Sequence, residues 1–306
     1  MLERVSKGPR NVRDVPTLIM EAENFLTWVK AQGVRVPAEN WIVRTMRGYA
    51  KMAGIEGDEL QKVYVKAFPN TGELQYNLAD FLQLNAIHMH IGKQDSAVLA
   101  DKLSSVVKGP NSLLDENGRN TASRNIRFEL FLTSKLNSHG YEALLRKANP
   151  DIFAKWHRDI SFGIECKRVY SGKTIDSLIG DAEVQFRDRP GNAGLNANVL
   201  ALDVTRAVTD GKLHISGSPV TAARKVAGIL EVVAEPIIAQ LQAQKYPNID
   251  AIILCYIDHV QPDIDKSFTL HGLTQLLVLD NPKAPRVRKR YALNALKHLA
   301  NSNIDL

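Results

Sequence analysis

Glu165 and Lys167 stand two residues apart at the end of an apolar run that begins at Ile160. Residues two apart on a strand point to the same face, so a strand here places both charges together and turns Ile164 and Cys166 into the core. A carboxylate and an ammonium at the end of an apolar strand are costly to bury unless they pair or bind a ligand. The pattern indicates a binding or catalytic site, or a plain strand-end ion pair.

A third charged residue, Asp151, follows Pro150 upstream of this run. A hairpin fits in the interval, with Ala154–Asp159 as its polar connector, and would place Asp151 beside Glu165 on the neighbouring strand. Two adjacent carboxylates repel each other unless a cation lies between them. Mg²⁺ or Mn²⁺ suits such oxygen ligands. Asp159 competes with Asp151 for the role of ligand.

Pro150–Asp151 followed by Glu165-x-Lys167 resembles the signature of the PD-(D/E)XK, restriction-endonuclease-like nucleases. The resemblance covers roughly residues 121 to 257 and includes the order of elements: a helix, a hairpin with the acids, a second helix and a buried strand. It implies that Glu129, on the first helix, is a further metal contact.

The same resemblance implies a role for Gln185, which matches the glutamine that many members carry on the helix after the motif. Glu183 or Arg187 could fill that role instead. All three positions fall in one predicted helix, 174–187, so spacing alone leaves the choice open.

The resemblance implies metal-dependent hydrolysis of a phosphodiester. Asp151, Glu165 and the Cys166 carbonyl would hold one or two Mg²⁺ ions, with Mn²⁺ as a substitute. Lys167 would orient the attacking water or stabilise developing negative charge. Glu129 would bind a second metal or position a water through the first.

The surrounding periodicity predicts an α/β fold: a restriction-endonuclease-like mixed sheet flanked by helices, preceded by an N-terminal all-helical domain. We expect a helical domain over residues 1–108 and a nuclease domain over 109–306, divided at the turn-forming segment that begins at Lys108. Helices are predicted at 17–32, 41–53, 58–67, 74–89, 95–107, 123–138, 174–187, 221–244 and 287–300. Strands are predicted at 160–169, 199–204, 249–257 and 273–279.

A basic cluster opens the last predicted helix, comprising Arg286, Arg288, Lys289 and Arg290, with Lys297 further along. Beside a nuclease core this cluster is predicted to contact the phosphate backbone, and its alternative is a solvated face. Asp203, at the end of the strand 199–204, is predicted to be a structural cap.

The composition is that of a soluble globular protein, with 44% apolar and 24% charged residues in a chain of 306. Its formal charge of +6 is compatible with a polyanionic partner. Two cysteines, Cys166 and Cys255, are too few for a disulfide framework or a structural zinc site and are expected to be buried free thiols. No signal core or membrane span is visible, so a cytoplasmic location and no membrane partner are expected.

The expected function is that of an Mg²⁺-dependent endonuclease acting on nucleic acid, DNA rather than RNA. Its architecture suggests a restriction or phage-defence effector, and two cuts in a duplex would favour a homodimer. The runner-up is a catalytically silent nucleic-acid-binding or scaffold protein on the same fold. A third reading is an unrelated α/β enzyme acting on a small phosphorylated substrate.

Overall fold

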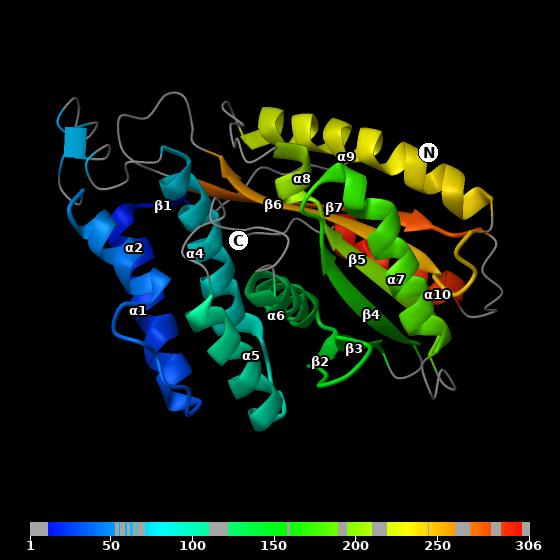
Figure 1. Ribbon diagram of the computed structural model, residues 1–306, viewed down its shortest axis with the longest axis horizontal. Coiled ribbons are helices and arrows are strands. Elements are labelled where there is room, and N and C mark those ends of the chain that lie inside the picture. Colours follow the sequence, from blue (N-terminus) through cyan, green and yellow to red (C-terminus); the bar gives the residue numbers. More distant parts are fainter. Residues whose placement is uncertain are drawn as a thin grey trace.

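The computed structural model describes residues 12–52, 71–109, 122–157, 160–188, 195–209, 219–243, 245–260, 270–282 and 289–301, with isolated positions between 53 and 70. Its centre is a mixed open sheet in the order β1-β7-β6-β5-β4-β3-β2 (Figure 1). β4, β5 and β6 run parallel, whereas the strands on either side of them pair antiparallel. The strands are β1 (Val12–Arg13), β2 (Glu142–Leu145), β3 (Ile152–Trp156), β4 (Ile160–Arg168), β5 (Ala197–Asp203), β6 (Ala251–Val260) and β7 (Leu270–Asp280).

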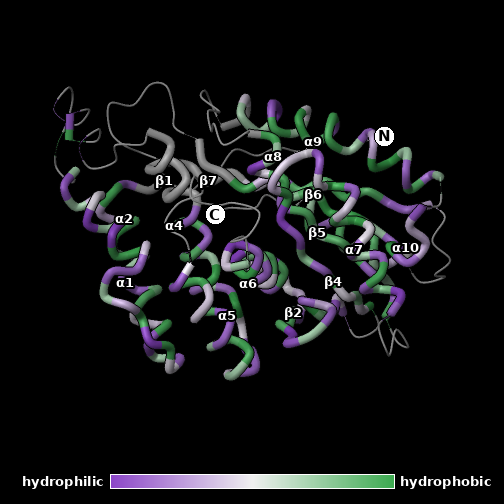
Figure 2. Tube along the Cα trace, viewed as in Figure 1, coloured by the Kyte–Doolittle hydropathy of each residue, from purple (hydrophilic) through white to green (hydrophobic). Residues whose placement is uncertain are grey.

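Helices cover both faces of the sheet, so the α/β class predicted from the sequence is confirmed. One face carries α6 and α10 and, outside α6, the N-terminal helices; the other carries α7, α8 and α9. The strands β5 and β6 are hydrophobic along most of their length (Figure 2). Their apolar residues are buried on both faces, as a sheet sandwiched between helices requires. The helices are α1 (Val15–Ala31), α2 (Trp41–Ala50), α4 (Thr71–His90), α5 (Ser96–Lys108), α6 (Ala122–Ser138), α7 (Ile175–Arg187), α8 (Thr205–Thr209), α9 (Pro219–Gln242) and α10 (Lys289–Asn301), with a 3₁₀ turn at Gly172–Thr174.

The N-terminal helices form where the sequence predicts them, because their caps are local. Asp14 and Asn40 cap the first turns of α1 and α2. Gly33 follows α1 with φ of 79°, a left-handed conformation that glycine adopts without strain, and ends the helix. These helices share one hydrophobic cluster with α6 and the sheet. The division into two domains at residue 108 stays a prediction.

Three local predictions need correction. Ala154–Trp156 belong to β3 and not to a connector, so the described part of the hairpin turn is His157 alone. The N-terminal part is not entirely helical, because β1 pairs with β7. The helix predicted from Trp41 to residue 53 ends at Ala50.

The sequence pattern also missed β2 and the short helix α8. β2 lies at the edge of the sheet beside β3, and its outward residues Glu142 and Leu144 are exposed. Of the helix predicted over 58–67 the structure describes only Glu59, Lys62, Val63 and Lys66, and these four positions are helical. No helix in the described part of the chain is long and apolar enough to cross a membrane.

Candidate active site

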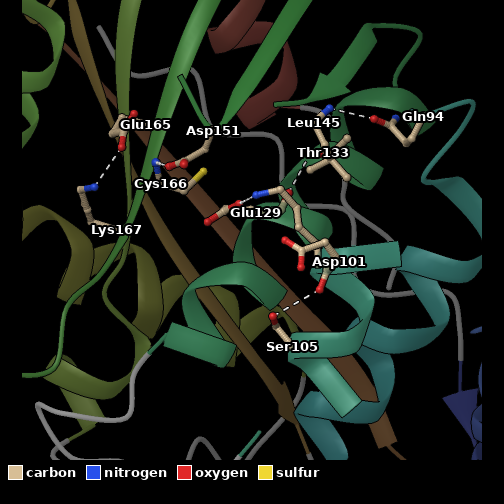
Figure 3. Close-up of polar contacts among 11 residues, drawn as sticks. Gln94, Asp101, Ser105, Glu129, Thr133, Leu145, Asp151, Glu165, Cys166 and Lys167 are labelled. Carbon is tan, nitrogen blue, oxygen red and sulfur yellow. Dashed lines mark hydrogen bonds and ion pairs between the residues drawn. The ribbon is translucent and has the colours of Figure 1, made fainter. Parts of the chain in front are cut away.

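Strand β4 presents Glu165 and Lys167 on one face, as their spacing predicts. Lys167 Nζ donates a hydrogen bond to Glu165 Oε1 over 2.9 Å (Figure 3). Ile164 and Cys166 are buried on the opposite face, in the cluster beneath α6. The Glu165 side chain is only 1% exposed and that of Lys167 18%. The pair is therefore largely buried on one face of β4, and the Lys167 ammonium lies nearer to solvent than the Glu165 carboxylate.

Asp151 reaches β4 because β3 begins at the next residue. Ile152 pairs with Ile164, and beyond this point β3 no longer supplies a backbone partner to β4. The Asp151 side chain replaces this backbone partner, because its Oδ2 accepts a hydrogen bond from the Cys166 N–H at 2.8 Å. The Asp151 backbone is held in turn, since its carbonyl accepts from the Arg146 N–H at 2.9 Å. The predicted proximity of Asp151 to the Glu165 strand segment is confirmed.

The backbone of Cys166 contributes a further oxygen at this point. Within a strand, the N–H and C=O of one residue point to the same edge. Since the Cys166 N–H faces Asp151, its carbonyl faces the same side, past the start of β3. Burial raises the pKa of the Cys166 thiol well above its usual value, so the thiol stays protonated. The carbonyl, not the sulfur, is the group that this residue offers to a hard cation.

Lys167 remains a cation in this setting. Burial alone would lower the pKa of its ammonium, but the charge and hydrogen bond of Glu165, together with the charge of Asp151, raise it above the usual value. A fixed positive charge therefore lies beside the two acids. It can stabilise negative charge that develops on a bound phosphate.

Glu129, on α6, approaches from the other face of the sheet. Its side chain is 8% exposed and forms an ion pair with Lys102 of α5, whose side chain is 12% exposed. Burial raises the pKa of Glu129 to about 7, and the charges of Asp151 and Glu165 add to the increase, whereas Lys102 opposes it. Glu129 thus shares the electrostatic environment of Asp151, although its nearest partner is a lysine. Figure 3 shows Glu129 on the side of β4 away from Lys167.

No protein-family model, curated protein or solved structure matches this chain.

Helix α7 covers the sheet face that carries Glu165 and Lys167, and it holds the three alternatives for the glutamine role. Glu183 accepts hydrogen bonds from the backbone and side-chain amides of Asn248, which makes it a support for the turn before β6. Arg187 is exposed and pairs with the adjacent Asp188. Gln185 has a buried Oε1 with no hydrogen-bond partner among the described residues. Of the three, Gln185 alone keeps a buried polar group available for a ligand.

Asp203 has the structural role that its position predicts. Its Oδ1 accepts from the Thr205 N–H at 3.0 Å and caps the start of α8. Its Oδ2 lies 3.5 Å from Arg168 Nε in a buried ion pair. The hydroxyl of Thr205 accepts from the Ile257 N–H, which ties the ends of β5 and β6 together. These contacts hold the end of β4 in place just beyond Lys167.

The basic cluster is described only in part. Arg286 and Arg288 lie outside the described residues, as does Asp159, the alternative to Asp151. Lys289 begins α10, and Arg290 and Lys297 are exposed on that helix. Its role in phosphate contact stays a prediction.

Sequence reasoning did not find Lys102, whose ammonium lies against Glu129. Position 102 carries no motif, and a lysine in a helix that otherwise shows regular amphipathic spacing reads as a solvent-exposed residue. Its role depends on how α5 packs against α6, which helical periodicity does not specify. No signal in the sequence could have identified it.

The donor set of the site fits a hard divalent cation that retains water. The described residues contain no group of three or more His, Cys, Asp or Glu side chains arranged to hold a metal ion. The available set is smaller: the carboxylates of Asp151 and Glu165 and the Cys166 carbonyl. Mg²⁺ is typically bound by one or two carboxylates plus substrate phosphate and water, so this set suits it.

Glu129 should make stability depend on pH between about 4.5 and about 7. Its pKa is raised from 4.5 to about 7 by folding, so the folded chain holds a proton there that the unfolded chain has released. The stabilisation is complete below that range and lost above it, on the order of 3 kcal/mol in all. Urea unfolding in EDTA across this range should show the decline in wild type and a flatter profile in Glu129→Gln. Parallel profiles would contradict the burial of an ionisable group at this position.

Proposed function

We propose that the chain is a metal-dependent nuclease of the PD-(D/E)XK, restriction-endonuclease-like kind, acting on DNA in preference to RNA. One observation carries the proposal: the Asp151 carboxylate is bonded to the backbone N–H of Cys166, the residue between Glu165 and Lys167. The Asp151 carboxylate therefore lies against the segment of β4 that carries Glu165 and Lys167, although it comes from the residue just before a different strand, β3. A chance D…ExK pattern would not require this convergence.

The arrangement of elements supports the same proposal. α6 precedes the acids, β3 and β4 form the hairpin that carries them, and α7 leads to the buried parallel strand β5. This is the order that the resemblance implies. The restriction-endonuclease-like fold is the finer description that we propose for the mixed α/β sheet.

Each residue has a role that follows from its contacts. Asp151, oriented by the Cys166 N–H, and Glu165, oriented by Lys167, would supply the carboxylate oxygens that hold a divalent cation. When bound there, a divalent cation would polarise the scissile phosphate and lower the pKa of a water. Lys167 holds a positive charge where the negative charge of the transition state develops. Gln185 offers a buried amide oxygen on the helix that covers this face.

The net charge of the chain agrees with a polyanionic substrate. The formal excess is +6, and Arg290 and Lys297 are exposed on α10. Cations of this kind attract nucleic acid through release of counterions without reading sequence. They support a phosphodiester substrate over a small neutral one.

The decisive experiment is incubation of the purified chain with plasmid DNA, single-stranded DNA and RNA, in Mg²⁺, in Mn²⁺ and in EDTA. We expect cleavage that requires a divalent cation, with duplex DNA cut faster than RNA. Cleavage that persists in EDTA would contradict the mechanism. Absence of cleavage of all three substrates by folded protein in both metals would contradict the function and favour a binding protein on the same fold.

A further inference from the structure

The ion pair between Lys102 and Glu129 joins the N-terminal helices to the candidate active site. Lys102 lies on α5, and its neighbour Leu103 is fully buried in the shared core. The loop before α5 is fixed as well, because Gln94 accepts from the Leu145 N–H and donates to the Ala143 carbonyl of β2. The position of Lys102 is therefore set by a helix that packs into the core through Leu103 and is tied to β2 through Gln94.

The charges at the site divide into two balanced pairs and one remaining acid. Lys102 pairs with Glu129, and Lys167 pairs with Glu165. Asp151 forms no ion pair with any described residue; its carboxylate accepts the Cys166 N–H. Each ammonium already faces another carboxylate, so the negative charge of Asp151 is the one that no described lysine balances. The position for a cation is therefore beside Asp151 and not beside Glu129.

We propose that Lys102 takes the position of a second divalent cation at Glu129, so that the site binds a single metal ion. That ion is held by Asp151, Glu165 and the Cys166 carbonyl. The inference rests on the proposed function, and it changes the expected role of Glu129. Glu129 is then a residue that positions Lys102 near the site and not a metal ligand.

Competition for one carboxylate is the physical basis of this proposal. A second divalent cation at Glu129 would lie close to the Lys102 ammonium, and like charges repel strongly where water does not screen them. Lys167 opposes a cation at Glu165 in the same way, but there the adjacent Asp151 carboxylate, which pairs with no described lysine or arginine, adds a negative charge that attracts the ion. Packing of α5 against α6 does not by itself require the Lys102–Glu129 ion pair, because apolar side chains at these two positions would give a similar free energy of unfolding.

Metal stoichiometry tests the proposal without relying on cleavage. Mn²⁺ binding to the full chain, followed by electron paramagnetic resonance of the free ion, should give about one tight ion per chain in wild type. Lys102→Met keeps the length of the side chain and removes its charge, so it should admit a second ion and give about two. Adding Glu129→Gln to Lys102→Met should restore the wild-type count, and Lys102→Arg should keep it.

If Lys102→Met does not fold, the number of bound ions in wild type and in Glu129→Gln still tests the proposal. Glu129→Gln alone should leave the wild-type count unchanged, because Glu129 holds no ion. Two tight ions in wild type, or loss of the ion in Glu129→Gln, would overturn the proposal. Two ions together with metal-dependent cleavage would overturn it while leaving the nuclease intact. A single ion without cleavage of any nucleic acid would support the count and contradict the proposed function.

Discussion

Glu165→Gln should lower the rate of metal-dependent DNA cleavage by about 10³-fold or more. Glutamine has nearly the same shape, but its neutral amide is a poor partner for a divalent cation and for the Lys167 ammonium, which the carboxylate now contacts at 2.9 Å. Because the side chain at 165 is only 1% exposed, the substitution changes charge without opening a cavity. The measurement is the rate of plasmid cleavage at saturating Mg²⁺, with circular dichroism to confirm the fold.

Glu142→Gln is the matched control, since it makes the same chemical change on the exposed side of the nearby strand β2. It should cleave at the wild-type rate. Retention of more than about a tenth of wild-type activity by Glu165→Gln would remove Glu165 from the mechanism.

Lys167→Met should also abolish cleavage, but it should destabilise the chain more than Glu165→Gln does. It leaves the Glu165 carboxylate at 1% exposure without its ammonium, whereas an 18% exposed Lys167 can turn toward water when its partner is lost. Loss of activity in Lys167→Met therefore has to be read beside its unfolding free energy.

The parts of the site that could be predicted are those determined by strand geometry. Period-two alternation along Ile160–Arg168 requires Glu165 and Lys167 to share a face, whatever the rest of the fold does. The position of Asp151 required one further step, the antiparallel pairing that sets Ile152 opposite Ile164. Both follow from short stretches of chain, so the sequence contained enough information.

The parts that could not be predicted depend on packing between elements distant in sequence. Lys102 and Glu129 are brought together by α5 against α6, and nothing in either helix specifies its partner. Strand β2 was not predicted for another reason: its four residues, Glu142–Leu145, are too few for the pattern to distinguish a strand from a loop. The end of β3 was wrongly predicted to belong to a polar connector, because Lys155 is charged; in the structure Lys155 lies on the exposed face of that strand.

Asp80→Ala should lower the free energy of unfolding by about 3–5 kcal/mol, the largest stability loss that we expect from a single charged side chain. Asp80 is 4% exposed and bonds to two buried guanidiniums, Arg127 Nη2 at 2.6 Å and Arg124 Nη2 at 3.2 Å. Removing the carboxylate leaves two positive charges facing each other in the core between α4 and α6. Urea unfolding followed by circular dichroism measures the change.

The exposed ion pair between Arg47 and Glu39 provides the control. Their distance is 2.7 Å, but their side chains are 59% and 62% exposed, so Glu39→Ala should cost no more than about 1 kcal/mol. Equal losses in the two variants would show that burial of the Asp80 network is not what stabilises α6.

The Asp80 network is connected to the candidate active site by α6, the helix that carries Arg124, Arg127 and Glu129. Arg124 and Arg127 lie on the first turns of α6, and Glu129 follows within one further turn. Arg127 also lies over the Trp41 ring at 5.7 Å, which fixes the start of α6 against α2. If the network sets the position of α6, then Asp80→Ala should weaken the Lys102–Glu129 contact even where the chain stays folded. The variant would then bind additional Mn²⁺ as Lys102→Met does, whereas Glu39→Ala would not.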